Sequence, residues 1–353
     1  MSFKEEKRES IKRYLLDKVA ADDSAFIQKT VENFSISITT VKRYLAECLE
    51  DEILKKSDTV TGYELVTEQF SRNYEQKEFL TEDRIYFEDI RPHLTHVTNE
   101  ALQIWDYVFM EMMNNAIEHS KGTHISVEFK KNYLFTEIAI ADDGIGIFQN
   151  ICNYLTEKFQ YRALYEDAVT ELYKGKLTTN PICHSGEGVF FSSKMMQNFV
   201  IWSDNTIFST GFLEKDKLVQ SHLISYYTRL QKIGTMVVMR LENQAARKIK
   251  EVFDMYAPVD EGFVKTVIPI REVCPYGEPI ARSQARRILF RLEKFKEVEL
   301  DFTGIEFMGQ GFADEIFRVF QNKHPELVLK PIHANESVLG MVKHVRVNLE
   351  QTV

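Results

Sequence analysis

The chain has 353 residues and a net charge of −9, so it is long enough for two or three domains and too acidic overall for a general polyanion binder. Its 44% hydrophobic and 27% charged residues are typical of a globular protein, and no run approaches the roughly 18 apolar residues of a membrane span. The polar N-terminus and four scattered cysteines without a CxxC pair predict a cytoplasmic protein without a zinc cluster.

Residues 1–66 predict a winged helix-turn-helix unit. Three segments with helical spacing precede two short alternating segments, which is the order helix, helix, turn, helix, wing. The start of the third helix carries residues suited to bases and phosphates: Thr39, Thr40, Lys42 and Arg43. Because acidic and basic residues are nearly equal in number here, two alternatives stay open, namely DNA binding and a protein-docking or dimerisation module.

Residues 67–83 are highly charged and predict a linker or connecting helix, after which residues 84–258 predict a two-layer α/β sandwich. The elements expected in the sandwich are a strand at 84–90, a long helix at 99–119, two strands within 124–144, a polar, partly helical insertion at 149–185, and strands at 198–204 and 234–241.

The stretch FMEMMNNAIEHS, at 109–120 in the long helix, has more polar side chains than a helix with an apolar face needs. Glu111 and Asn115 lie four residues apart, hence on one face, and Asn114 stands beside them. Asparagine lowers helical propensity, which indicates a role other than folding. Carboxylate and amide oxygens suit magnesium, and a carboxylate can activate water. The alternative is a polar rim on a surface helix.

The stretch ADDGIGIF, at 141–148, follows an expected strand. The carboxylate of Asp142 can accept a hydrogen bond from an exocyclic amine. Gly144 and Gly146 allow the backbone to approach a flat ring closely, although such a pair taken alone is typical of an ordinary turn.

Two further motifs contain glycine. Gly186 and Gly188 come directly before an expected helix, whose unpaired N–H groups and dipole suit phosphate oxygens. Thr235 follows a glycine at the head of a strand. Each motif by itself would also fit a simple helix or strand start.

Taken together, ExxxN, DxGxG, GxG before a helix and GT before a strand resemble, in this order, the GHKL ATP-binding family of gyrase, heat-shock protein 90, histidine kinases and mismatch-repair ATPases. The resemblance covers residues 84–242 and implies the Bergerat fold, with ATP and Mg²⁺ as ligands and residues 149–185 as the ATP lid. The implied roles are Glu111 as general base, Asn115 as magnesium ligand, Asn114 as part of the same wall, Asp142 and Thr235 at the adenine amine, Gly144 and Gly146 beside the base, and Gly186 and Gly188 at the phosphates.

Two lysines of the expected lid, Lys174 and Lys176, either reach the phosphates or are solvated charges, and His184 is either a hinge or phosphate contact or a structural residue. Histidine kinases have a phospho-acceptor His-Glu pair on a preceding helical hairpin. Since His93 and His96 form no such pair, we expect no histidine-kinase activity. A protein-serine kinase of the anti-sigma-factor type remains open.

Residues 262–353 form a third unit with a strand, a helix at 311–323 and another strand. The stretch VELDFTGIEFMGQGFADEIF resembles the STAS domain of anti-sigma-factor antagonists, in a STAS-like version. The antagonists have a phosphorylated serine where this chain has Gly309, Gln310 and Gly311, so we expect no phosphorylation at this turn. Thr303, nearby, is interpreted as structural.

These features predict a Mg-ATP-binding ATPase that acts as a regulatory switch and couples its nucleotide state to DNA or to a protein partner. The STAS-like unit is the expected site of the protein partner, no membrane contact is expected, and the resemblance includes homodimers. The alternatives are an anti-sigma-type protein-serine kinase and an ATP-sensing DNA-binding regulator without turnover.

Overall fold

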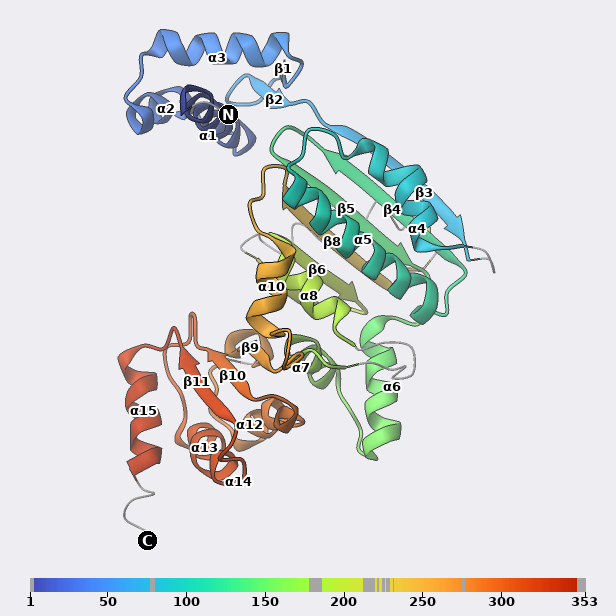
Figure 1. The fold of residues 1–353 in the computed structure, drawn as a ribbon, viewed down its shortest axis with the longest axis vertical. Coiled ribbons are helices and arrows are strands. Elements are labelled where there is room, and N and C mark those ends of the chain that lie inside the picture. Colours follow the sequence, from blue (N-terminus) through green and yellow to red (C-terminus); the bar gives the residue numbers. More distant parts are fainter. Residues whose placement is uncertain are drawn as a thin grey trace.

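The computed structural model describes residues 3–76, 80–177, 186–211, 232–274 and 277–347, together with residues 220, 222, 223, 226, 229 and 230. Figure 1 shows an N-terminal helical unit, a central unit built on a large sheet, and a smaller C-terminal α/β unit. The described strands form sheets of two, six and three strands, one in each of these units.

The N-terminal unit has three helices and a hairpin in the order expected from the sequence. Its elements are α1 (Phe3–Ala20), α2 (Phe26–Phe34), α3 (Ile38–Glu50), β1 (Leu54–Lys56) and β2 (Tyr63–Leu65). Leu15, Leu16, Val41 and Cys48 are buried in its core. The Ser37 hydroxyl caps α3 by accepting a hydrogen bond from the backbone N–H of Thr40. In Figure 1, α3 lies on the side of this unit that faces away from the rest of the chain.

The central sheet is antiparallel throughout, with the order β3-β4-β5-β8-β6-β7. Its strands are β3 (Glu68–Glu75), β4 (His124–Lys131), β5 (Phe135–Asp142), β6 (Asn198–Ser203), β7 (Thr206–Thr210) and β8 (Thr235–Glu242). One face is covered by α5 (Asn99–His119) and α8 (Gly188–Met195), and α10 (Ile249–Tyr256) packs against these two helices, as Figure 1 shows. The central unit is therefore a layer of helices on a sheet, with its site at one end of β5 and β8.

Within the segment expected to be a linker or connecting helix, 67–83, residues 68–75 instead form β3, which pairs along its length with β4. This strand is at the edge of the sheet and is largely solvent-exposed, with only Phe70 and Tyr74 packed on the core, so its sequence has little apolar pattern. The strand predicted at 84–90 is also wrong. Helix α4 (Glu82–Ile85) continues there into a π-helix (Tyr86–Ile90) and a 3₁₀ turn (Arg91–His93).

The C-terminal unit has the expected strand-helix-strand series around a parallel sheet of order β11-β10-β9. Its elements are β9 (Lys265–Pro269), α11 (Ile270–Val273), α12 (Arg282–Leu289), a 3₁₀ turn (Leu292–Lys294), β10 (Glu297–Asp301), α13 (Gln310–Asp314) continued by a π-helix (Glu315–Phe320) and α14 (Gln321–Lys323), β11 (Val328–Ile332) and α15 (Glu336–Val347).

The central and C-terminal units share one continuous apolar core. Phe263 connects them, because its ring lies 4.7 Å from that of Phe190 in α8 and 5.4 Å from that of Phe295 in the C-terminal unit. The predicted insertion supplies two further helices, α6 (Ile147–Phe159) and α7 (Tyr165–Lys174), and α7 contacts both units. These two units therefore do not move as separate bodies without breaking apolar contacts.

Candidate functional site

A cavity of about 380 Å³ lies between the helical layer and one end of the central sheet. Most of the polar and glycine residues singled out from the sequence line this cavity: Glu111, Asn114, Asn115, Asp142, Gly146, Gly186, Gly188 and Thr235. The remaining one, Gly144, is not among the described lining residues. The chain thus brings four motifs, separated by as many as 124 residues from Glu111 to Thr235, to one place.

Asp142 and Thr235 are cross-strand neighbours at the ends of β5 and β8. The Asp142 carboxyl is almost completely buried, and burial raises its pKa to about 7 although the backbone N–H groups of Gly144 and Thr235 donate to it. The Thr235 hydroxyl accepts a hydrogen bond of 2.9 Å from the Ile147 N–H at the start of α6. A buried carboxyl of this kind is a hydrogen-bond acceptor that discriminates strongly for a donor.

Gly144 and Gly234 permit the close backbone approach behind Asp142. A Cβ on Gly144 would lie 2.0 Å from the Ser120 carbonyl oxygen, and one on Gly234 would lie 2.5 Å from the Gly144 carbonyl oxygen. The Lys232 ammonium also donates to that carbonyl oxygen, at 2.7 Å. Gly144 therefore shapes the turn that carries Asp142 and does not form the wall itself.

The N-terminus of α8 faces α5 across the cavity. A Cβ on Gly188 would lie 2.1 Å from Oε2 of Glu111, so the Glu111 carboxylate lies against the first turn of α8. Burial raises the pKa of the neighbouring Glu187, and burial with nearby Glu111 and Glu187 raises that of the Tyr107 hydroxyl. Two carboxyl groups, those of Glu111 and Glu187, therefore lie at the N-terminal end of α8, and burial disfavours the ionised form of Glu187.

The resemblance assigned the insertion as an ATP lid, but sequence reasoning identified none of the residues around α7 that line the cavity, and it did not foresee α10. Glu171, Leu172, Gly175 and Leu177 line one side, and Phe253 comes from α10. Apart from Glu171 these are apolar residues or glycine, which carry no chemistry recognisable in a sequence. The indications were the helical spacing within the insertion and its resemblance to an ATP lid.

The expectation of a solvated charge or a phosphate contact is wrong for Lys174, whereas Lys176 is partly exposed. Only 1% of the Lys174 side chain is exposed, and its ammonium pairs with Glu171. The Lys176 ammonium donates to the Lys294 carbonyl oxygen at 2.9 Å, in the C-terminal unit. His184 and the rest of the insertion beyond residue 177 lie outside the described residues.

The candidate DNA-contacting residues lie at the start of α3. Thr39, Lys42 and Arg43 are exposed, whereas Thr40 is partly buried and its hydroxyl is 3.0 Å from that of Ser37. Arg43 has an acidic neighbour, since its Nε lies 3.7 Å from a Glu47 carboxylate oxygen.

In the C-terminal unit, Gly309 is the N-cap of α13, and a Cβ on it would lie 2.7 Å from the Ile280 backbone. The Thr303 hydroxyl donates to an Asp301 carboxylate oxygen at 2.7 Å, which agrees with its structural interpretation. A glycine at position 309 is therefore required by the packing of this turn.

Residues 284–339 match the family described as a STAS-like domain of unknown function (DUF4325). No curated protein matches the chain. The prediction of a STAS-like domain at the C-terminal end is thereby confirmed. Among the residues that the structure describes, no helix combines the length and the apolar character needed to cross a membrane.

Proposed function

We propose that the cavity binds Mg-ATP and that the chain is a GHKL-type ATPase, which switches between nucleotide states to control a DNA or protein partner. The observation that carries this proposal is the meeting, in one cavity, of a buried carboxyl acceptor, Asp142, with the N-terminus of α8 at Gly188. An adenine amine fits the first and phosphate oxygens fit the second.

The cavity also meets the size and packing requirements of such a ligand. Its volume of about 380 Å³ lies within the range of small-molecule sites, and apolar residues of the sheet, including Ile140 and Val237, provide a surface for a base. Gly188 has no side chain, which allows the Glu111 carboxylate to lie against the first turn of α8, where a Cβ would collide with it.

Magnesium would be held by the amide oxygen of Asn115 together with phosphate and water oxygens. When bound, the ion would neutralise phosphate charge. Glu111 is the residue that would orient or deprotonate the attacking water, because its carboxylate lines the cavity and lies against the first turn of α8.

The two flanking units would provide the regulated interactions, one with DNA and one with a protein partner. The exposed Thr39, Lys42 and Arg43 on a capped helix favour a winged helix-turn-helix that reads DNA, and the STAS-like unit favours a protein partner. The rival activity is a protein-serine kinase of the anti-sigma type. The STAS-like match favours it, but Gly309, Gln310 and Gly311 offer no acceptor within the chain at that turn.

Calorimetric titration of Mg-ATP and Mg-ADP into wild type and three variants tests the proposal. Asp142→Asn presents a wrong partner to the amine and should weaken both nucleotides alike. Asn115→Ala should weaken binding that depends on magnesium. Glu111→Ala should retain binding but reduce phosphate release by a factor of about 100 or more.

Wild-type affinity in both Asp142→Asn and Asn115→Ala would exclude this cavity as the nucleotide site. Binding without any phosphate release, even with a partner present, would favour an ATP-sensing regulator. Transfer of phosphate to a partner protein would favour the kinase.

A further inference from the structure

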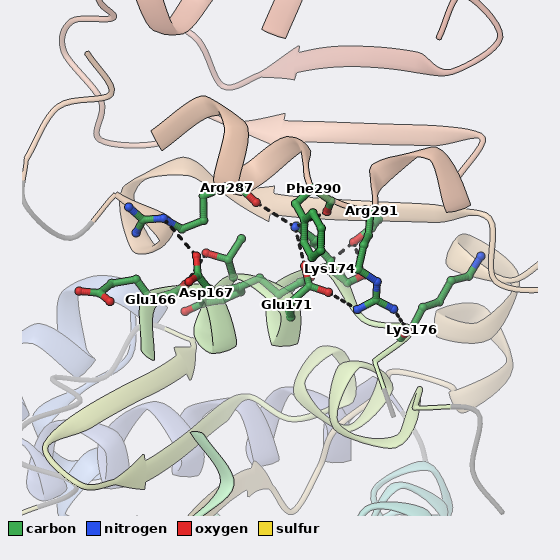
Figure 2. Close-up of polar contacts among 11 residues, drawn as sticks. Glu166, Asp167, Glu171, Lys174, Lys176, Arg287, Phe290 and Arg291 are labelled. Atoms are coloured by element: carbon green, nitrogen blue, oxygen red, sulfur yellow. Dashed lines mark hydrogen bonds and ion pairs between the residues drawn. The ribbon is translucent and has the colours of Figure 1, made fainter. Parts of the chain in front are cut away.

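Helix α7 joins the cavity to the STAS-like unit through buried charges, shown in Figure 2. We use the name latch for the side chains of Glu171 and Lys174, on α7, and Arg291, which follows α12. All three side chains are at least nine-tenths buried. Burying a charge lowers the stability of a fold unless the charge has a partner, so the partners of these three groups determine what the cluster does.

Lys174 connects α7 to the end of α12. Its ammonium donates to Oε1 of Glu171 at 2.7 Å and to the carbonyl oxygens of Arg287 and Phe290 at 3.1 and 2.6 Å. Arg287 is in the last turn of α12 and Phe290 is its C-cap, where carbonyl oxygens lack intrahelical donors and the helix dipole favours a cation. A lysine of the lid thus caps a helix of the STAS-like unit.

Arg291 makes the reciprocal connection. Its guanidinium donates to the other carboxylate oxygen of Glu171 and, at 3.1 Å, to the carbonyl oxygen of Lys176 just beyond α7. The Thr266 hydroxyl of β9 donates to the Lys174 carbonyl oxygen at 2.9 Å. The charges of Glu171 and Lys174 and the carbonyl oxygens of Lys174 and Lys176 therefore all have partners in the C-terminal unit.

The same end of α7 forms one side of the cavity. Glu171 belongs to both the latch and the cavity lining, and Leu172, Gly175 and Leu177 complete that side. Gly175 has a φ of +75°, and a Cβ on it would lie 2.7 Å from the Phe263 ring, so the chain turns here in tight contact with the C-terminal unit. A displacement of α7 from that unit would carry this wall with it.

We propose that the STAS-like unit regulates the nucleotide site by holding α7 through the latch, so that the latch sets how tightly the cavity retains its ligand. The identity of the ligand, Mg-ATP, rests on the proposed function, whereas the contact between α7 and the STAS-like unit does not depend on it. Apolar residues such as Phe263 also join the two units, and the latch is the polar part of this contact. Removing one latch charge leaves its partner buried and unpaired, which weakens the hold on α7. Because coupling is reciprocal, ligand in the cavity should also strengthen the contact between α7 and α12.

Neighbouring positions on α12 provide a test and its control. Arg287 faces α7, with its Nε 3.7 Å from an Asp167 carboxylate oxygen, whereas Arg286 faces away and pairs with Glu315 at 2.9 Å. Arg287→Gln and Arg286→Gln each remove one guanidinium from the same helix. The stronger variant is Arg291→Gln. The pair Glu171→Gln/Lys174→Met removes one negative and one positive buried charge and leaves the Arg291 guanidinium without its carboxylate partner.

Two measurements on the full chain decide the proposal. The first is hydrogen exchange of the α7 amides, with and without Mg-ATP. Exchange should rise in Arg291→Gln and the paired variant, rise less in Arg287→Gln, and stay at the wild-type level in Arg286→Gln. The second is the dissociation constant for Mg-ATP, which should rise about 10-fold or more in Arg291→Gln, within the usual range of site coupling, and remain unchanged in Arg286→Gln.

Unchanged α7 exchange in every latch variant would overturn the latch. Faster exchange with unchanged nucleotide affinity would overturn its control of the cavity. Wild type that binds no nucleotide, while α7 exchange responds to the variants as expected, would overturn the proposed function and leave the contact between α7 and the STAS-like unit established.

Discussion

Among single residues, Asp142 shows how a sequence motif and its environment define chemistry together. The motif indicated an acceptor, but only the fold shows that burial raises the pKa of this carboxyl to about 7. Its hydrogen-bonding capacity therefore changes within the physiological pH range. A ligand amine donates to the carboxylate, so binding favours the ionised form and releases the proton carried below that pKa.

The affinity for adenosine, which has no titrating phosphate, should consequently rise with pH. Between pH 6 and pH 8 the ionised fraction of Asp142 grows from about one-tenth to about nine-tenths, so the affinity should increase by about tenfold. Asp142→Asn should bind weakly with no such dependence. Titrations at several pH values test this, and an affinity that stays flat or falls with pH in the wild type would contradict the assigned role.

A second prediction at this scale concerns the effect of substituting Gly234 on stability. A Cβ there would lie 2.5 and 2.6 Å from two backbone atoms of Gly144 and 2.7 Å from the Asp142 carboxylate, and backbone atoms cannot yield easily. Gly234→Ala should reduce the free energy of unfolding by about 1–3 kcal/mol. Gly340→Ala, in the exposed part of α15 with no atom within 4 Å, should instead stabilise by up to about 1 kcal/mol. Urea unfolding of both variants measures the contrast; equal effects would refute it.

The residues of the cavity that sequence reasoning identified share one property: they are polar, or glycine, where folding alone does not require it. Glu111 and Asn115 stood out for that reason. Leu172 and Leu177 did not, because an apolar residue on a helix is equally expected in any core. The burial of Lys174 could not be foreseen either, since its partners lie 113 and 116 residues away along the chain.

Among elements, those with a strong hydrophobic periodicity could be predicted from the sequence, whereas the strand at the edge of the central sheet could not. Helix α5 occupies the residues expected of it, 99–119, because its apolar stripe is long and Thr98 caps it. Strand β3 was missed because an edge strand buries little. Residues 84–90 were misread because Ile85, Tyr86 and Ile90, all buried, make too short a run to distinguish helix from strand.

Helix α3 allows a prediction about the N-terminal unit. If it reads DNA, Lys42→Ala/Arg43→Ala should weaken binding and reduce the slope of log affinity against log salt by about 2, since each phosphate contact contributes about 0.9. Lys323→Ala/Lys343→Ala removes two exposed lysines from the STAS-like unit and should have no effect. Electrophoretic shifts at several salt concentrations measure both. No binding of any duplex at low salt, with or without ATP, would support a docking module instead.

For the whole molecule, the cavity lies in a framework that contacts both flanking units. Strands β5 and β8 carry Asp142 and Thr235 at one end, and at the other end they meet the N-terminal unit. There the Arg13 guanidinium pairs with Glu242 at 2.8 Å, and the Tyr133 hydroxyl donates to Glu9 at 2.6 Å. With α7 also contacting the C-terminal unit, the framework around the cavity contacts both flanking units.

Leu134 is the residue through which the N-terminal connection can be tested. It belongs to the turn between β4 and β5, yet it is buried in the N-terminal core, where it packs with residues such as Leu15 and Leu45. Leu134→Ala should leave a cavity in that core and destabilise it by about 2–5 kcal/mol. The central strands retain their pairing, so the N-terminal unit should unfold earlier, as a separate transition in calorimetry.

Tyr133→Phe is the matched control, because it removes only the hydroxyl that donates to Glu9 and should cost about 0.5–1.5 kcal/mol. If β5 and β8 transmit nucleotide binding in the cavity to the N-terminal unit, Mg-ATP should raise the unfolding temperature of the whole wild-type chain. In Leu134→Ala it should raise only the temperature of the later transition. A Leu134→Ala variant in which the nucleotide still stabilises both transitions equally would show that the N-terminal unit responds through another contact. A variant that loses stability only in the central unit would show that this turn does not join the two.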